Sequence, residues 1–315
     1  MIAFAARRGA MLLVALLVSS FVIFASLDLA PGDPLSTLSG GRTLPAETVA
    51  QLKADYNLDD PFLSRYVSWL GGAVQGDLGT SIRFRQPVGT LIGDRIGVTL
   101  ALVAYASLLI VLFGVGLGVL AGLRKGWLDT SILVSSTVLA AVPSFVMAIV
   151  LLSVFAVNLG WFPALGAGDG FVDGIKHLTL PAVALAASAG AIVVRVTRVS
   201  VRAELGREHV QTAISRGIPQ GLVVRRHVLR NAAIPVTTVV GVTLTSLIAL
   251  SAVVERAFSL NGLGSALVEA ALSKDLAVVQ GIALVLVAAF VLSNALVDVL
   301  YSVLDPRVAL GSRAQ

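Results

Sequence analysis

The sequence contains no cysteine, and only three histidines occur among its 315 residues. Without cysteine there can be no disulfide, no thiolate nucleophile and no zinc–thiolate site. His177, His209 and His227 are too widely spaced to form a three-histidine metal site on one helix. We therefore expect a structural or loop role for each histidine, and we predict neither a metal site nor a cofactor.

Charge is also scarce. Only 13% of the residues are charged, against about 25% in soluble proteins. No glycine is followed by lysine, so the glycine-rich phosphate-binding loop of many ATPases is excluded. The apolar segments contain no clear relay of Asp, Glu or His of the kind used by proton-coupled or sodium-coupled carriers. The missing loop predicts that this chain does not hydrolyse ATP itself, and the missing relay argues against a carrier coupled to protons or sodium. We expect a protein that is not an enzyme.

Apolar residues dominate what is present. The chain is 57% hydrophobic with a mean hydropathy of +0.92, which predicts an all-α membrane protein. Six apolar segments are long enough to cross a bilayer, so we expect six transmembrane helices. They lie at about residues 9–30, 99–123, 131–159, 178–197, 232–254 and 276–304. We expect Pro143 to kink the third, and Pro181 and Pro235 to lie near the starts of the fourth and fifth.

The polar segments divide the chain further. We expect an N-terminal span at 1–30, an extracytoplasmic insert at 31–95, a membrane core at 96–304 with a cytoplasmic loop at 202–232, and a cytoplasmic tail at 305–315. Basic clusters at the N-terminus, at Arg124 and Lys125, in that loop and in the tail predict that both termini are cytoplasmic. The first span could also be a cleavable signal peptide, but its apolar run exceeds the usual 7–15 residues.

The insert has its own helical signals. Pro45 begins one candidate helix, which extends to Tyr56. Phe62, Tyr66 and Trp69 share one face of a second candidate helix, with aromatic rings suited to the membrane interface. An ordinary amphipathic surface helix would show the same pattern.

Two features of the membrane core concern packing. Gly114, Gly118 and Gly122 recur every four residues, a spacing that lets two helix backbones approach closely in a membrane. Asp298 is a carboxylate well inside a predicted span. We expect it to pair with Arg195 or Arg198, and the alternative is a role in transport.

The loop is the long polar segment on the basic side. From Arg195 to Arg230 it holds eight arginines against two glutamates. Val210, Ala213, Ile214 and Gly217 recur at helical spacing, so a short helix would present a narrow apolar face that we interpret as a docking surface. Gly217 can end that helix in the left-handed conformation, and Pro219 suits the start of the next.

Residues 210–217, VQTAISRG, and 225–235, RRHVLRNAAIP, resemble the EAA loop of permease subunits in bacterial ABC importers of the dipeptide/oligopeptide type. Matches in 58–88, 255–264 and 305–307 extend the resemblance over nearly the whole chain. His209, Gln211 and the pair Ile214 and Ser215 depart from the usual pattern of the loop. The resemblance implies the type I ABC importer permease fold, with a helical periplasmic insert between spans 1 and 2. It also implies a helix that couples the permease to the ATPase, at Val210, Gln211, Thr212, Ala213, Ile214, Arg216, Gly217 and Pro219.

The same resemblance implies function and partners. It predicts a permease that moves dipeptides and oligopeptides across the cytoplasmic membrane of a bacterium. The implied partners are two cytoplasmic ATPase subunits, an extracytoplasmic binding protein and a related second permease in a heterodimer, with lipid around the spans and no nucleic acid. Nickel chelates or glutathione are alternative cargoes, and a homodimer is an alternative assembly. A self-contained secondary carrier, with a loop that only contacts anionic lipid, is the competing class of function.

Overall fold

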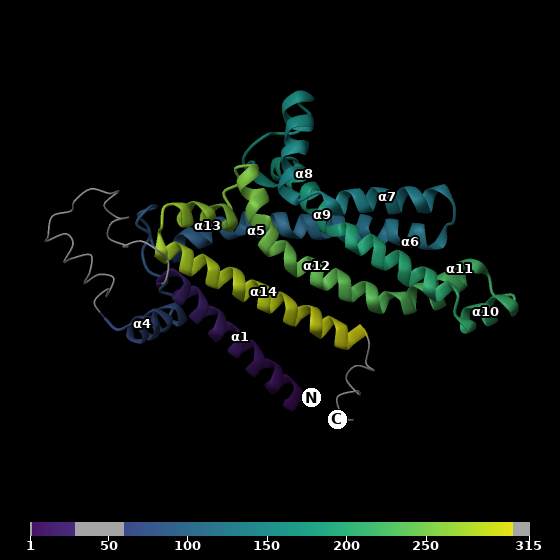
Figure 1. Ribbon diagram of the computed structural model, residues 1–315, viewed down its shortest axis with the longest axis horizontal. Coiled ribbons are helices and arrows are strands. Elements are labelled where there is room, and N and C mark those ends of the chain that lie inside the picture. The colour runs from purple at the N-terminus through teal and green to yellow at the C-terminus, as the bar shows by residue number, and fades with distance from the viewer. Residues whose placement is uncertain (1, 29–59, 305–315) are drawn as a thin grey trace. The chain divides into compact units, whose positions relative to one another are not determined.

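The computed structural model describes the backbone of residues 2–28 and 60–304 and the side chains of residues 9–26 and 60–297. The described part is helical, apart from turns, loops and one isolated bridge between Thr80 and Pro87 (Figure 1). The candidate helix from Pro45 to Tyr56 lies outside it. Two compact units divide the chain: residues 1–97 with 262–291, and residues 98–261 with 292–315.

The first unit contains α1 (Ile2–Asp28), α4 (Phe62–Val74), the start of α5 (Val88–Leu109), α13 (Leu263–Leu272) and the start of α14 (Leu276–Leu304). The rings of Phe62, Tyr66 and Trp69 on α4 pack against Phe21 and Phe24 of α1. The aromatic face predicted for the membrane interface is therefore used for packing between these two helices.

A buried carboxylate fixes the loop before α5 in this unit. Asp275, directly before α14, accepts hydrogen bonds from the Ser81 hydroxyl at 2.6 Å and from the Arg83 backbone N–H at 2.9 Å. Beside it, an apolar cluster joins Val88 and Leu91 to Leu263 and Ile282. The start of α5 is thereby held against α13 and α14.

The second unit is built around one long helix, α9 (Gly170–Leu205). In this unit α5 continues through a π-helical segment, η1 (Ile110–Val115), into α6 (Gly116–Leu123). Then follow α7 (Trp127–Ala141), α8 (Ser144–Leu151), η2 (Leu152–Asn158), α9, α10 (Glu208–Ser215), α11 (Gln220–Val223), η3 (Val224–Val228) and α12 (Leu229–Ala257). Helices α6, α7, α8 and α12 all contact α9 (Figure 1).

Among the described residues, five helical segments are long and apolar enough to cross a membrane, and a sixth span is formed if α7 and the helix that follows it count as one. The prediction of an all-α membrane protein is confirmed. The third span is interrupted at Pro143, where a kink was predicted, and the helices on either side are bent by 102° relative to each other. Val142 is extended, as the residue before a proline prefers to be, so the helix breaks at Pro143.

Other helix boundaries also differ from the predicted ones. The second span starts at Val88 and not at Thr99, within the segment assigned to the insert. Pro181 and Pro235 lie inside α9 and α12, because both helices begin earlier than their apolar segments. Hydropathy locates the part of a helix that crosses the lipid, but it does not locate the polar turns that extend it.

Gly114, Gly118 and Gly122 face α9. A Cβ atom on Gly118 would lie 2.5 Å from the Thr197 Cβ and 2.8 Å from the Val194 carbonyl oxygen. A Cβ on Gly122 would lie 2.7 Å from the Val201 Cβ. These glycines let α6 approach α9 within the same chain, so they do not require a second chain to pack against.

Gly118→Ala is expected to lower the apparent melting temperature of the detergent-purified protein, since the new methyl group overlaps α9 backbone that cannot move away cheaply. Gly116→Ala is the matched control, because no heavy atom outside its own stretch of helix lies within 4 Å of the position of its Cβ. The control should leave the melting temperature unchanged or slightly raised. Equal effects of the two substitutions would contradict the packing described here.

Candidate functional site

The loop of the second unit folds as a short helix, a glycine turn and a second helix. Helix α10 ends at Ser215, and Gly217 has a φ of +75°, the left-handed conformation predicted for it. The Gly217 N–H donates to the Ile214 carbonyl at 2.9 Å and the Ile218 N–H donates to the Ala213 carbonyl at 3.2 Å. These two bonds form a Schellman motif, in which a residue without Cβ is favoured at the left-handed position. Pro219 directly precedes α11, close to its predicted place in the first turn.

The apolar face of α10 is turned inward. Val210 is fully buried and Ala213 is 5% exposed, and they pack among Val201, Val228 and Ala232. The interpretation of this face as a docking surface was therefore wrong for Val210 and Ala213. Helical spacing shows that a face is buried, but not whether the same chain or a partner covers it.

The other side chains of α10, including Ile214 at the edge of the apolar face, are open. Ile214 is 49% exposed. Gln211, Thr212, Ser215 and Arg216 are also exposed. The Gln211 side chain donates to the Leu205 carbonyl at the end of α9, at 2.9 Å. The predicted coupling residues thus divide into two that hold α10 to the chain and others that face outward.

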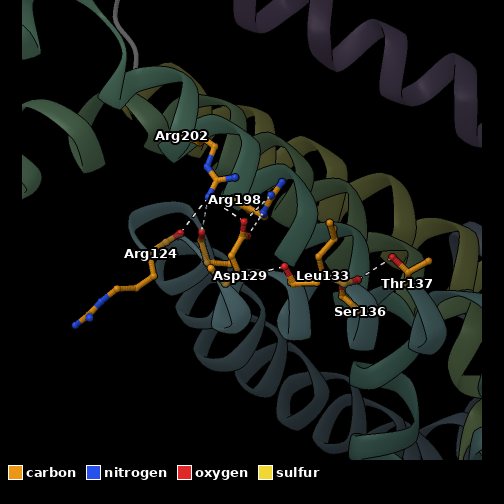
Figure 2. A network of polar contacts seen from close by, with 10 residues as sticks. Arg124, Asp129, Leu133, Ser136, Thr137, Arg198 and Arg202 are labelled. Atoms are coloured by element: carbon orange, nitrogen blue, oxygen red, sulfur yellow. Dashed lines mark hydrogen bonds and ion pairs between the residues drawn. The ribbon is translucent and has the colours of Figure 1, made fainter.

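An ion cluster joins α7 to α9 on the part of α9 that leads to this loop. Figure 2 shows the guanidinium groups of Arg198 and Arg202 directed at the Asp129 carboxylate. Arg198 binds through Nε and Nη2, the latter at 2.9 Å, and Arg202 Nη2 binds at 2.9 Å. Arg202 also donates to the Arg124 carbonyl at 3.0 Å. One carboxylate therefore holds two cations, and one of these, Arg202, also holds the turn between α6 and α7.

Sequence reasoning did not find this cluster. It considered only carboxylates deep inside predicted spans and assigned Asp298 as the partner of Arg195 or Arg198. Arg198 is bound by Asp129, which lies near the start of α7. The side chain of Asp298 lies outside the described residues. The one sequence feature that could have indicated the cluster is Asp129 itself, an aspartate two residues after Trp127 and close to the basic turn at Arg124 and Lys125.

The chemistry of the described part is that of a scaffold. No group of three or more His, Cys, Asp or Glu side chains among the described residues could hold a metal ion. A cavity of about 450 Å³ between η1, α7 and α9 is lined by Phe113, Ser135, Ser136 and Ala187 together with other small or apolar side chains. Such a lining offers packing and hydroxyl groups but no charged group for acid–base chemistry.

We expect Asp129→Asn to lower the melting temperature of the purified protein by several degrees, because two guanidinium groups lose their shared anion. Adding Arg198→Gln to Asp129→Asn should cost less than Arg198→Gln alone, since both substitutions break one network. Asp94→Asn is the control, because the Asp94 side chain is exposed. Additive effects of Asp129→Asn and Arg198→Gln would show that the cluster does not act as a unit.

Comparison with known proteins extends this description. Residues 114–310 match the family model of the binding-protein-dependent transport system inner membrane component. Residues 1–103 match the model of the N-terminal part of the same membrane components. Together the two matches cover both the insert and the membrane core.

Curated relatives align over almost the full length. A putative peptide transport system permease protein of Brucella abortus is 37% identical, over 96% of this chain and 97% of its own length. The oligopeptide transport system permease protein AppB of Bacillus subtilis is 35% identical, over 98% and 99%. The dipeptide transport system permease protein DppB of Alkalihalophilus pseudofirmus is 32% identical over the same shares. The chain therefore belongs to the inner membrane components of binding-protein-dependent transport systems, as a multi-pass, non-catalytic permease subunit of an ABC transporter.

Proposed function

We propose that this permease imports dipeptides and oligopeptides. The observation that carries the proposal is the sequence identity of 35–37%, over 96–98% of the chain, to permeases named for peptide and oligopeptide transport. A permease named for dipeptide transport is similar over the same extent. Membership of a binding-protein-dependent family implies a substrate-binding protein and ATPase subunits as partners.

In this proposal α10 is the element that receives the ATPase. Its exposed side chains, Gln211, Thr212, Ile214 and Arg216, form the contact. Val210 and Ala213 do not touch the partner, because they hold α10 against the apolar cluster of its own chain. Gly217 and Pro219 set the direction in which the chain leaves α10. Closure of the ATPases on ATP pushes α10, and the permease pair alternates between outward and inward access.

The arrangement in the membrane follows from charge. The basic loop around α10 is cytoplasmic, and both termini lie on the same side. Two ATPase subunits act on a pair of permeases, of which this chain is one and a related permease is the other. The insert at 31–95 supports a heterodimer over a homodimer, because two copies of it would crowd the face on which a single binding protein docks.

Uptake of labelled di- to hexapeptides, of nickel and of glutathione, measured in cells with and without this chain, tests the proposal. Peptide uptake is expected to fall to background without it, and to depend on the ATPases, the binding protein and the second permease. Loss of nickel or glutathione uptake with peptide uptake unchanged would contradict the substrate class. Uptake that persists without the ATPases would instead indicate a secondary carrier.

A further inference from the structure

Three helices of the second unit meet at the carboxylate of Glu204. This residue lies in the last turn of α9, and its side chain is only 15% exposed. Its Oε1 accepts a hydrogen bond of 3.0 Å from the Asn231 side chain near the start of α12. The same oxygen lies 3.1 Å from Nε2 of His209, in the first turn of α10. Asn231 Nδ2 and His209 Nε2 are themselves 3.3 Å apart, so the three side chains form a closed triangle.

The donors and acceptors of this triangle are defined by its chemistry. An ionised carboxylate can only accept hydrogen bonds, and the Asn231 amide nitrogen can only donate. His209 therefore binds Glu204 in the form that carries a proton on Nε2, and in that form His209 and Asn231 both donate to Glu204 and do not bond to each other. Arg207 Nε lies 3.9 Å from Oε2, but the Arg207 side chain is 70% exposed, so this second ion pair adds little.

The contacts of Glu204 with His209 and Asn231 fix the orientation of α10, which the apolar contact beneath α10 cannot do. Helix α10 has eight residues, too few to be stable in isolation, so contacts with the rest of the chain must hold it. Val210 and Ala213 provide an apolar contact, which is non-directional and leaves rotation about the helix axis weakly restricted. Hydrogen bonds depend on angle and distance, so bonds to α9 and α12 fix the orientation of α10.

We propose that Glu204, His209 and Asn231 are positioning residues that lock α10 to α9 and α12, so that a push on α10 displaces both spans together. This rests on the proposed function, in which α10 receives the ATPase. Neither the helix pattern nor the resemblance of the loop singled out these residues as a group, because each comes from a different helix. We call these three residues the clamp. The clamp sets how efficiently ATP hydrolysis is converted into transport, and it does not participate in hydrolysis or in binding peptide.

The first experiment uses the full transporter in proteoliposomes, with a labelled dipeptide and a labelled hexapeptide as cargo. Glu204→Ala and Asn231→Ala are each expected to reduce the peptide transported per ATP hydrolysed by about tenfold, the order expected for one hydrogen bond to a charged group. Hydrolysis itself should continue. The double variant should fall no further than the worse single variant, because both remove the same clamp.

Two substitutions of His209 test whether its hydrogen bond to Glu204 matters or only the volume of its side chain. His209→Gln keeps a side-chain N–H that can reach Glu204 and should retain most of the transport per ATP, whereas His209→Leu should lose it. Its side chain is 44% exposed, so both substitutions are compatible with folding. Arg207→Gln is the matched control, since it removes only the exposed neighbour of the same carboxylate. Equal ratios of transport to hydrolysis in His209→Gln, His209→Leu and wild type would overturn the proposal.

A second experiment does not require transport. Spin labels on the exposed residues Ser215 of α10, Ala203 of α9 and Ala233 of α12 report the distances between these helices in the purified complex. We expect narrow distance distributions in wild type, with and without vanadate-trapped nucleotide, and broad ones in Glu204→Ala. Narrow distributions in Glu204→Ala would refute the clamp. If the wild-type complex moves no peptide while the label distances behave as expected, the proposed function fails and the clamp stands.

Discussion

The close approach of α6 to α9 is the contact on which the rest of the second unit depends. In a bilayer the lipid tails are as apolar as the helices, so helix association comes from packing and hydrogen bonds and not from burial away from water. At Gly118 and Gly122 a Cβ atom would overlap α9, at Thr197 and the Val194 carbonyl oxygen in the first case and at Val201 in the second. Other helices then pack on the remaining sides of α9, which becomes the axis of the unit (Figure 1).

Because α9 extends beyond the apolar part of the chain, it connects that core to the loop. Arg198 and Arg202 tie it to α7 through Asp129, and Glu204 in its last turn meets α10 and α12. The glycine contact, the Asp129 ion cluster and the Glu204 contacts with His209 and Asn231 follow one another along α9. In the proposed function, these contacts would link α10 through α9 to the helices of the core.

Local signals in the sequence were sufficient for some of this arrangement. Gly217 predicted the end of α10 because the left-handed turn suits a residue without Cβ, and the glycine spacing in α6 predicted a close helix contact. The contacts of Asp129 and Asn231 could not be predicted, because their partners are 69 and 27 residues away along the chain. Periodicity identified Val210 and Ala213 as one face, but what covers that face is a tertiary property. The angle of the bend at Pro143 could not be predicted either. It depends on packing against other helices, which the sequence pattern of a single helix does not show.

The central claim is that α10 meets the ATPase with its outward face. Cross-linking is the most direct test, and this chain has no native cysteine that would react in place of the introduced one. A cysteine at Ile214, on the exposed face, should cross-link to a cysteine in the ATPase, and a cysteine at the fully buried Val210 should not. Cross-linking through Val210 with none through Ile214 would contradict the account, because it would place the partner on the face that the chain itself covers.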